Sequence, residues 1–166
     1  MSIFNASING NLKKLKKMIN NENINELNLG FTCLHYAAFY GKFKIVKYLI
    51  EECDADFEIR TLNGSTAFLL AVINNHYKII NYLLNIVDIS IPNNDGYNAL
   101  HMAIYNNNLH IIKILLSVNK KDEIWINPYD KTKDVYKYNA MELALFLNKM
   151  EIYNFLIDYI KKNDIF

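Results

Sequence analysis

The sequence predicts an all-α solenoid, in which short helix–turn–helix units are stacked one on another. The first observation is a repeated segment: Gly30–Ala38 returns as Gly64–Val72 and again as Gly96–Ile104. The glycines that open the copies are 34 and then 32 residues apart, a period typical of stacked repeat arrays. The second observation is that another segment repeats in register behind the first. Each unit therefore has two parts.

The second part of each unit has the pattern of an amphipathic helix. It covers Gly41–Ile50, Asn75–Leu84 and Asn107–Leu116, with apolar residues at i, i+1, i+4 and i+5. That spacing places one apolar stripe on one helical face. A glycine or asparagine stands at each break between the two helices, and these residue types tolerate the left-handed backbone that often ends a helix. We therefore expect left-handed residues at Gly10, Gly41, Asn75 and Asn107.

These segments resemble the ankyrin repeat, whose unit opens with glycine, a threonine two residues later, and then leucine, histidine and paired alanines, as in Gly30–Ala38. The resemblance covers essentially the whole chain. It implies one domain, residues 1–166, of about five repeats with approximate bounds 1–24, 25–58, 59–90, 91–126 and 127–166. We expect the weaker first and last copies to be caps, because the ends of a solenoid turn one face to water.

The chain departs from the family pattern at three places. The usual proline after the threonine is absent, which removes a preset backbone angle at helix entry; the residues there are Cys33, Ala67, Ala99 and Ala140. The histidine is kept in two copies and replaced in two others, by Leu69 and Glu142. Repeats four and five are about eight residues further apart than the usual period of about 33 residues predicts, so we expect an extended loop within Asp130–Tyr138.

Composition indicates one soluble, intracellular domain. No apolar run approaches the roughly 18–20 residues that a membrane span requires, and the N-terminus enters the first repeat without a secretory signal. We expect a cytoplasmic protein, with the nucleus as the alternative, and two reduced cysteines. The net charge of +1 does not favour binding to nucleic acid. The basic run Lys13–Lys17 is read as the solvated face of a cap, with an acidic or phosphate-bearing partner as the alternative.

Catalytic motifs are absent from the sequence, and we expect neither enzymatic activity nor a cofactor. A metal site needs three or four converging ligands, which His35 and His101 alone do not supply. In ankyrin repeats this histidine bonds neighbouring backbone, and the resemblance implies the same role here. We expect His76 and His110 to face solvent near the start of second helices.

The resemblance further implies that partners are bound by a concave surface built from hairpin tips and the exposed side of each first helix. The corresponding contact positions here are rich in aromatic residues, which anchor many interfaces. They are Phe31, Phe39, Tyr40, Leu62, Asn63, Ile73, Asn74, Asp95, Tyr97, Tyr105, Asn106 and Phe146, with Leu29 and Leu147 beside them. The structural alternative is that Phe31 and Tyr97 fold over their hairpins while Phe39 and Tyr105 pack between repeats.

These features predict a non-enzymatic protein–protein interaction module that is monomeric when free. One hypothesis is a stand-alone adaptor or inhibitor, of the kind found among viral and parasite effectors. The other is a scaffold or assembly-chaperone subunit of a larger complex, whose aromatic face would be permanently covered. A soluble monomer favours the first hypothesis, and concentration-dependent association of the isolated chain favours the second.

Overall fold

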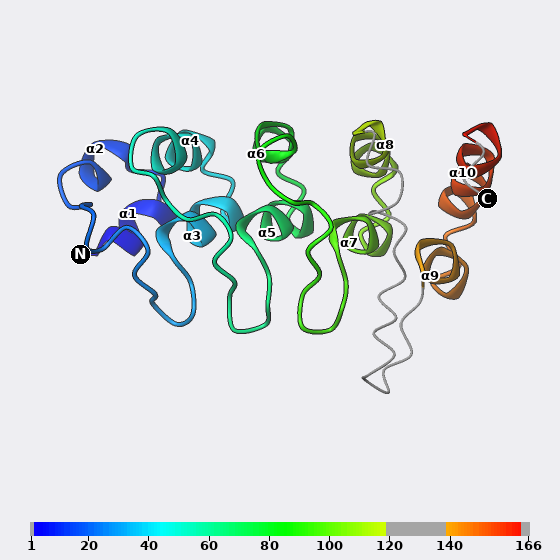
Figure 1. Cartoon of the computed structure of the whole chain (residues 1–166), viewed down its shortest axis with the longest axis horizontal. Helices are drawn as coiled ribbons and strands as arrows, with labels where there is room; N and C mark the ends of the chain where they lie inside the picture. The colour runs from blue at the N-terminus through cyan, green and yellow to red at the C-terminus, as the bar shows by residue number, and fades with distance from the viewer. Residues whose placement is uncertain (1, 119–138, 164–166) are drawn as a thin grey trace. The chain divides into compact units, whose positions relative to one another are not determined.

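The computed structural model describes residues 2–118 and 139–163, and these residues form ten helices (Figure 1). The helices are α1 (Ile3–Ile8), α2 (Leu12–Leu15), α3 (Cys33–Phe39), α4 (Phe43–Glu51), α5 (Ala67–Ile73), α6 (Tyr77–Leu83), α7 (Ala99–Tyr105), α8 (Leu109–Ser117), α9 (Ala140–Phe146) and α10 (Met150–Lys162). The only β pairing in these ranges is an isolated bridge between Asn28 and Phe31. The predicted all-α fold is confirmed. The predicted loop Asp130–Tyr138 lies outside the described residues.

The chain divides into two compact units, Met1–Asp88 and Ile89–Phe166. In the first unit the helices form two layers (Figure 1). The first helices α1, α3 and α5 lie side by side, and α3 packs on both of its neighbours. The second helices α2, α4 and α6 form the other layer, each packed on the first helix of its own repeat.

The second unit contains α7 to α10. Helix α7 packs on its own second helix α8 and on the next first helix, α9, which in turn packs on α10. The two second helices are joined by a hydrogen bond that the Tyr159 hydroxyl donates to the carbonyl oxygen of Leu116, at 2.8 Å. No described helix has the length and hydrophobicity that crossing a bilayer requires.

Small residues allow the helices of each repeat to approach closely. Ala37, Ala71 and Ala103 occupy the same position in α3, α5 and α7, and each is fully buried. Larger apolar side chains from the second helices fill the space between, among them Leu49 and Ile80. Because interiors are packed at near-crystal density, a larger side chain at the alanine positions would push the helices apart.

Every first helix begins with a side-chain cap. In α3 the Thr32 hydroxyl accepts a hydrogen bond from the backbone N–H of His35, and the imidazole Nδ1 accepts one from the backbone N–H of Thr32, at 3.1 Å. Asn98 with His101 and Asn139 with Glu142 form the same reciprocal capping box. A capping box satisfies backbone donors that a helix start leaves unpaired. It compensates in part for the missing prolines.

The predicted left-handed residues between first and second helices are confirmed. Gly10 and Gly41 have φ of 70° and 69°, Asn75 and Asn107 have φ of 58° and 56°, and Asn148 adds a fifth case at 54°. Each follows the C-cap of a first helix, where a left-handed residue satisfies the last carbonyls.

Gly41 also lies against a histidine of the next repeat, which corrects the expectation that His76 faces solvent. The His76 Nε2 donates a hydrogen bond to the carbonyl oxygen of Phe39 at 2.8 Å and so ties the start of α6 to the end of α3. A Cβ at position 41 would lie 2.6 Å from the imidazole ring. The histidine occupies the space that the missing side chain leaves. His110 is exposed, as expected.

Gly41→Ala should therefore lower the free energy of unfolding by about 2 kcal/mol, from the left-handed backbone and the displaced hydrogen bond together. Gly10→Ala is the matched control, because its Cβ would meet only the flexible end of Lys42, at 3.1 Å. Urea denaturation of both variants separates the two contributions. Equal losses would show that the His76 contact contributes nothing.

The hairpin before α3 closes through a two-residue turn with an unusual first residue. Asn28 and Phe31 exchange two backbone hydrogen bonds of 2.9 and 3.0 Å, and Leu29 and Gly30 between them both have positive φ. Two left-handed residues define a type I′ turn, which favours Asn-Gly. Leu29 instead places a leucine at φ 52°, with 83% of its surface exposed.

Leu29→Asn should raise the free energy of unfolding by about 0.5–1 kcal/mol, since asparagine tolerates the left-handed region that leucine disfavours. Leu29→Ala is the control, because it removes the exposed side chain and keeps the unfavourable backbone. Thermal and urea unfolding measure both variants. An asparagine variant no more stable than the alanine variant would rule out backbone strain at this turn.

Candidate functional site

Exposed apolar side chains gather on the hairpins and at the ends of first helices. We call these positions of each unit its contact face: the hairpin residues before each first helix, the helix itself on its open side, and its C-cap. Six of the ten exposed large apolar residues in the described ranges lie there: Leu27, Leu29, Tyr40, Leu62, Tyr105 and Phe146. Of the other four, Tyr77, Ile86 and Met150 lie on or next to second helices, and Leu145 occupies the helix position at which Ile104 is fully buried in the preceding repeat.

In the first unit, the contact face begins with a cluster of aromatic rings. Phe31 is half-buried and packs on Tyr36 and Phe39, with ring centroids 5.2 and 6.5 Å apart. Phe39 in turn packs edge to face on Tyr40, at 5.0 Å. Tyr40 stands at the C-cap of α3 and is 46% exposed. The structure therefore places Phe31 and Phe39 as supports and Tyr40 as the ring most accessible to a partner.

The next hairpin of this unit adds an exposed leucine. Leu62 is 82% exposed, and its side chain lies over the backbone of Gly30 in the preceding hairpin. Asn63 beside it is exposed and accepts a hydrogen bond from the Thr61 hydroxyl within the hairpin. At the end of α5, Ile73 and Asn74 are half-buried.

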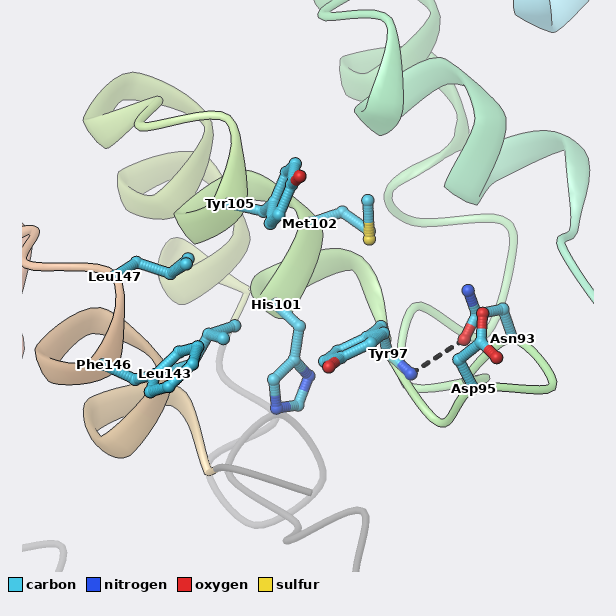
Figure 2. Close-up of a pocket in the computed structure, with 9 residues that line it drawn as sticks. All are labelled: Asn93, Asp95, Tyr97, His101, Met102, Tyr105, Leu143, Phe146 and Leu147. Atoms are coloured by element: carbon cyan, nitrogen blue, oxygen red, sulfur yellow. Dashed lines mark hydrogen bonds between the residues drawn. The ribbon is translucent and has the colours of Figure 1, made fainter. Parts of the chain in front are cut away.

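In the second unit, the contact face contains a cleft between α7 and α9, which Figure 2 shows in close-up. Its volume is about 240 Å³. Helix α7 and its hairpin supply Tyr97, Tyr105 and the less exposed Met102, and α9 supplies the opposite wall. The remaining lining residues are Asn93, Asp95, His101, Leu143, Phe146 and Leu147. Asp95, Tyr97, Tyr105 and Phe146 of the predicted contact positions are thus brought to one concavity, and Asn106 follows at the C-cap of α7.

The polar end of this cleft is fixed by the hairpin. The backbone N–H of Tyr97 donates a 2.9 Å hydrogen bond to the side-chain oxygen of Asn93, drawn as the dashed line in Figure 2. The Tyr97 ring is half-buried and packs edge to face on His101 at 5.8 Å. Tyr97 therefore supports the cleft floor, while Tyr105 and Phe146, 63% and 65% exposed, form its open rim.

The lysines of the N-terminal basic run lie on the other layer of the first unit. The Lys16 ammonium is 4.6 Å from the centroid of the Tyr48 ring on α4, a cation–π contact. Lys47 forms an ion pair of 3.7 Å with Glu51, and Tyr82 donates a hydrogen bond to the same carboxylate. Lysines predominate in this layer, and its glutamates, Glu51 and Glu52, stand together at the end of α4.

Comparison with known proteins identifies the family. The family profile described as ankyrin repeats (3 copies) matches residues 3–93 and 84–165. The chain belongs to the ankyrin-repeat family. It is also 34% identical over 85 residues to the Target of rapamycin complex 2 subunit AVO2 of Saccharomyces cerevisiae, an alignment that covers 48% of this chain and 20% of the yeast protein. About half of this ankyrin-repeat chain therefore aligns with about a fifth of that relative.

Ankyrin repeats are a protein–protein interaction fold, and their histidines here are structural. His35 is buried, and its Nε2 donates a 2.9 Å hydrogen bond to the carbonyl oxygen of Ile59 in the next hairpin. Burial lowers the pKa of His35 from 6.5 to about 4, although the bond to the Ile59 carbonyl opposes the shift. The imidazole is therefore neutral at pH 7 and joins one ankyrin repeat to the next. His101 is buried in the equivalent capping box, with Nδ1 2.7 Å from the side-chain oxygen of Asn98.

The remaining reactive side chains of the ankyrin repeats are dispersed. Within residues 2–118 and 139–163, no group of three or more His, Cys, Asp and Glu side chains could hold a metal ion. Cys33 is fully buried at the start of α3, and burial raises the pKa of its thiol. Both cysteines are free thiols.

Sequence reasoning missed several residues of these surfaces. Leu27 is exposed on the contact face of the first unit, and Met102 and Leu143 line the cleft. Leu145 is exposed, although Val72 and Ile104 at the same helix position of earlier copies are fully buried. The sequence signal for this difference is the place of α9 in the last copy, because the ends of a solenoid turn one face to water.

Proposed function

We propose that the chain binds another protein through the contact faces of its ankyrin repeats. The observation that carries this proposal is the concentration of exposed large apolar side chains there, six of the ten in the described residues. Burial of apolar surface contributes about 25 cal/mol per Å², so such residues are costly to leave in water. Contiguous exposed apolar surface marks interaction sites in many proteins.

The anchors of this interface are Tyr40 in the first unit and Tyr105 and Phe146 in the second. Each is substantially exposed at the end of a first helix, and none is required to fill the core. Aromatic anchors offer a large contact area at a low cost in side-chain entropy, and they dominate many protein interfaces. We propose a stand-alone adaptor or inhibitor without enzymatic activity or cofactor, acting as a monomer in the cytoplasm or nucleus and not on nucleic acid.

A second candidate is a scaffold or assembly subunit of a larger complex. The similarity to a protein named as a subunit of target of rapamycin complex 2 favours it. In that case the contact faces would be covered permanently. Sedimentation of the isolated chain at increasing concentration distinguishes the two: a monomer supports the adaptor, and association supports the assembly subunit.

Site-specific photo-crosslinking tests the proposed function. The photoreactive amino acid p-benzoylphenylalanine would replace Tyr40, Tyr105 or Phe146 in the full chain, one position at a time. The matched controls are Tyr77 and Tyr153 on second helices. After irradiation in an extract of the source cells, the proposal predicts one shared protein crosslinked from contact-face positions and absent from the controls. Crosslinks from the control positions alone would refute it.

A further inference from the structure

The cleft between α7 and α9 has the size of one large side chain. Pockets that enclose a drug-sized ligand or cofactor measure about 300–1,000 Å³. This cleft measures about 240 Å³, and a wholly apolar cavity of about 150 Å³ is enough to hold benzene. Its dimensions therefore suit a single aromatic or long aliphatic group and not a nucleotide or other cofactor.

The walls of the cleft match an apolar occupant. Leu143 of α9 and Leu147 at its C-cap line one side of the cleft, and Met102 and Tyr105 of α7 line the other (Figure 2). Tyr105 and Phe146 are exposed at the rim. Methionine fills irregular gaps and adapts to the shape of an inserted group. Aromatic rims add edge-to-face contacts to an inserted ring.

The described elements that form the cleft carry acidic side chains. The hairpin of residues 89–98, α7 and α9 contain two charged side chains, Asp95 and Glu142, and no lysine or arginine. Asp95 lines the cleft itself and is exposed, and Glu142 lies in the first turn of α9. The described lysines of this unit, in contrast, lie on or at the start of second helices: Lys113, Lys149, Lys161 and Lys162.

We propose that the cleft takes a bulky apolar side chain of the protein partner, and that a lysine or arginine next to that side chain in the partner pairs with Asp95. This proposal rests on the proposed function and specifies the chemistry of the segment bound. The apolar walls select the inserted group, and the carboxylate of Asp95 selects its neighbour.

Three dipeptide amides serve as probes, each N-acetylated: arginyl-tryptophan, glutamyl-tryptophan and arginyl-alanine. Nuclear magnetic resonance of the full ¹⁵N-labelled chain follows their titration. Arginyl-tryptophan should shift amides of Asp95–Tyr105 and of α9. Glutamyl-tryptophan should bind more weakly, and arginyl-alanine should leave these amides unchanged because it has no group to fill the cleft.

Two variants and their matched controls localise the binding. Asp95→Asn should weaken binding of arginyl-tryptophan by about 2- to 5-fold, as expected for an exposed ion pair, and leave glutamyl-tryptophan no weaker. Asp158→Asn on α10 removes the same charge elsewhere and should have no effect. The double variant Tyr105→Ala/Phe146→Ala should abolish the shifts, while Tyr77→Ala should preserve them.

Absence of shifts in α7 and α9, or equal binding of the arginyl and glutamyl probes, would overturn the proposal. Contacts between α9 and residues 119–138 of the chain itself, seen as nuclear Overhauser effects, would overturn it as well by giving the cleft an internal occupant. Because photo-crosslinking from Tyr40 in the first unit reports partner binding independently of the cleft, these outcomes can occur while the proposed function stands.

Discussion

Replacing Tyr40, Tyr105 and Phe146 together by alanine is expected to weaken partner binding by about 100-fold or more. Truncation of an aromatic anchor costs about 2 kcal/mol when the residue is a hot spot, and about 1.4 kcal/mol corresponds to a tenfold change in affinity. The three side chains are exposed in the free chain, so the helical circular dichroism spectrum should be unchanged. Tyr97 is left intact, because its ring packs on His101 and its removal would disturb the repeat.

The matched control is the quadruple lysine variant, in which Lys13, Lys14, Lys16 and Lys17 become alanine. Charges away from the anchors act mainly on the rate of encounter, so this variant should change the salt dependence of association more than the affinity at physiological salt. Surface plasmon resonance against the crosslinked partner measures both quantities. Retained affinity in the aromatic variant, with loss of binding in the lysine variant, would move the site to the N-terminal basic run.

Lowering the pH from 7 to 5 is expected to reduce the free energy of unfolding by about 2 kcal/mol through His35 alone. Its pKa is about 4 in the folded chain and 6.5 as the ordinary value, so the unfolded chain binds more protons between these two pH values. The contribution of His35 to the free energy of unfolding is therefore fully present above pH 6.5. It is lost as the pH falls toward 4, at about 1.4 kcal/mol per pKa unit.

Urea denaturation at pH 7, 6 and 5 measures this dependence. His35→Gln is the control, since glutamine does not titrate. The variant should start less stable, because the bond from the imidazole to the Ile59 carbonyl is lost, but its stability should depend less on pH. A wild-type chain equally stable at pH 7 and pH 5 would contradict a neutral, buried His35.

The features predicted successfully from the sequence are those that depend on local chemistry repeated in register. Gly41, Asn75 and Asn107 are left-handed because few residue types tolerate that backbone, and the sequence places such types at each break. The buried alanines and the histidine caps follow from the same repetition. One copy of the pattern would have been weak evidence for the fold. Several copies in register are compatible with few other folds.

The features that were not predicted depend on contacts between repeats. His76 bonds to Phe39 because the space above Gly41 is open, and nothing around His76 in the sequence indicates this. Leu29 occupies a turn position that usually holds asparagine, and only the backbone angles show that this leucine is left-handed. The cleft requires α7 and α9 to be placed side by side, across 34 residues of chain between Tyr105 and Ala140.

Hydrogen–deuterium exchange of the chain with and without its crosslinked partner tests the central claim most directly. The account predicts slowed exchange in the hairpins around residues 27–31, 61–65 and 93–97 and at the C-terminal ends of α3, α7 and α9. Amides on the outer side of α2, α4 and α6 should be unchanged. Protection confined to those second helices, with none in the hairpins, would contradict binding through the contact faces.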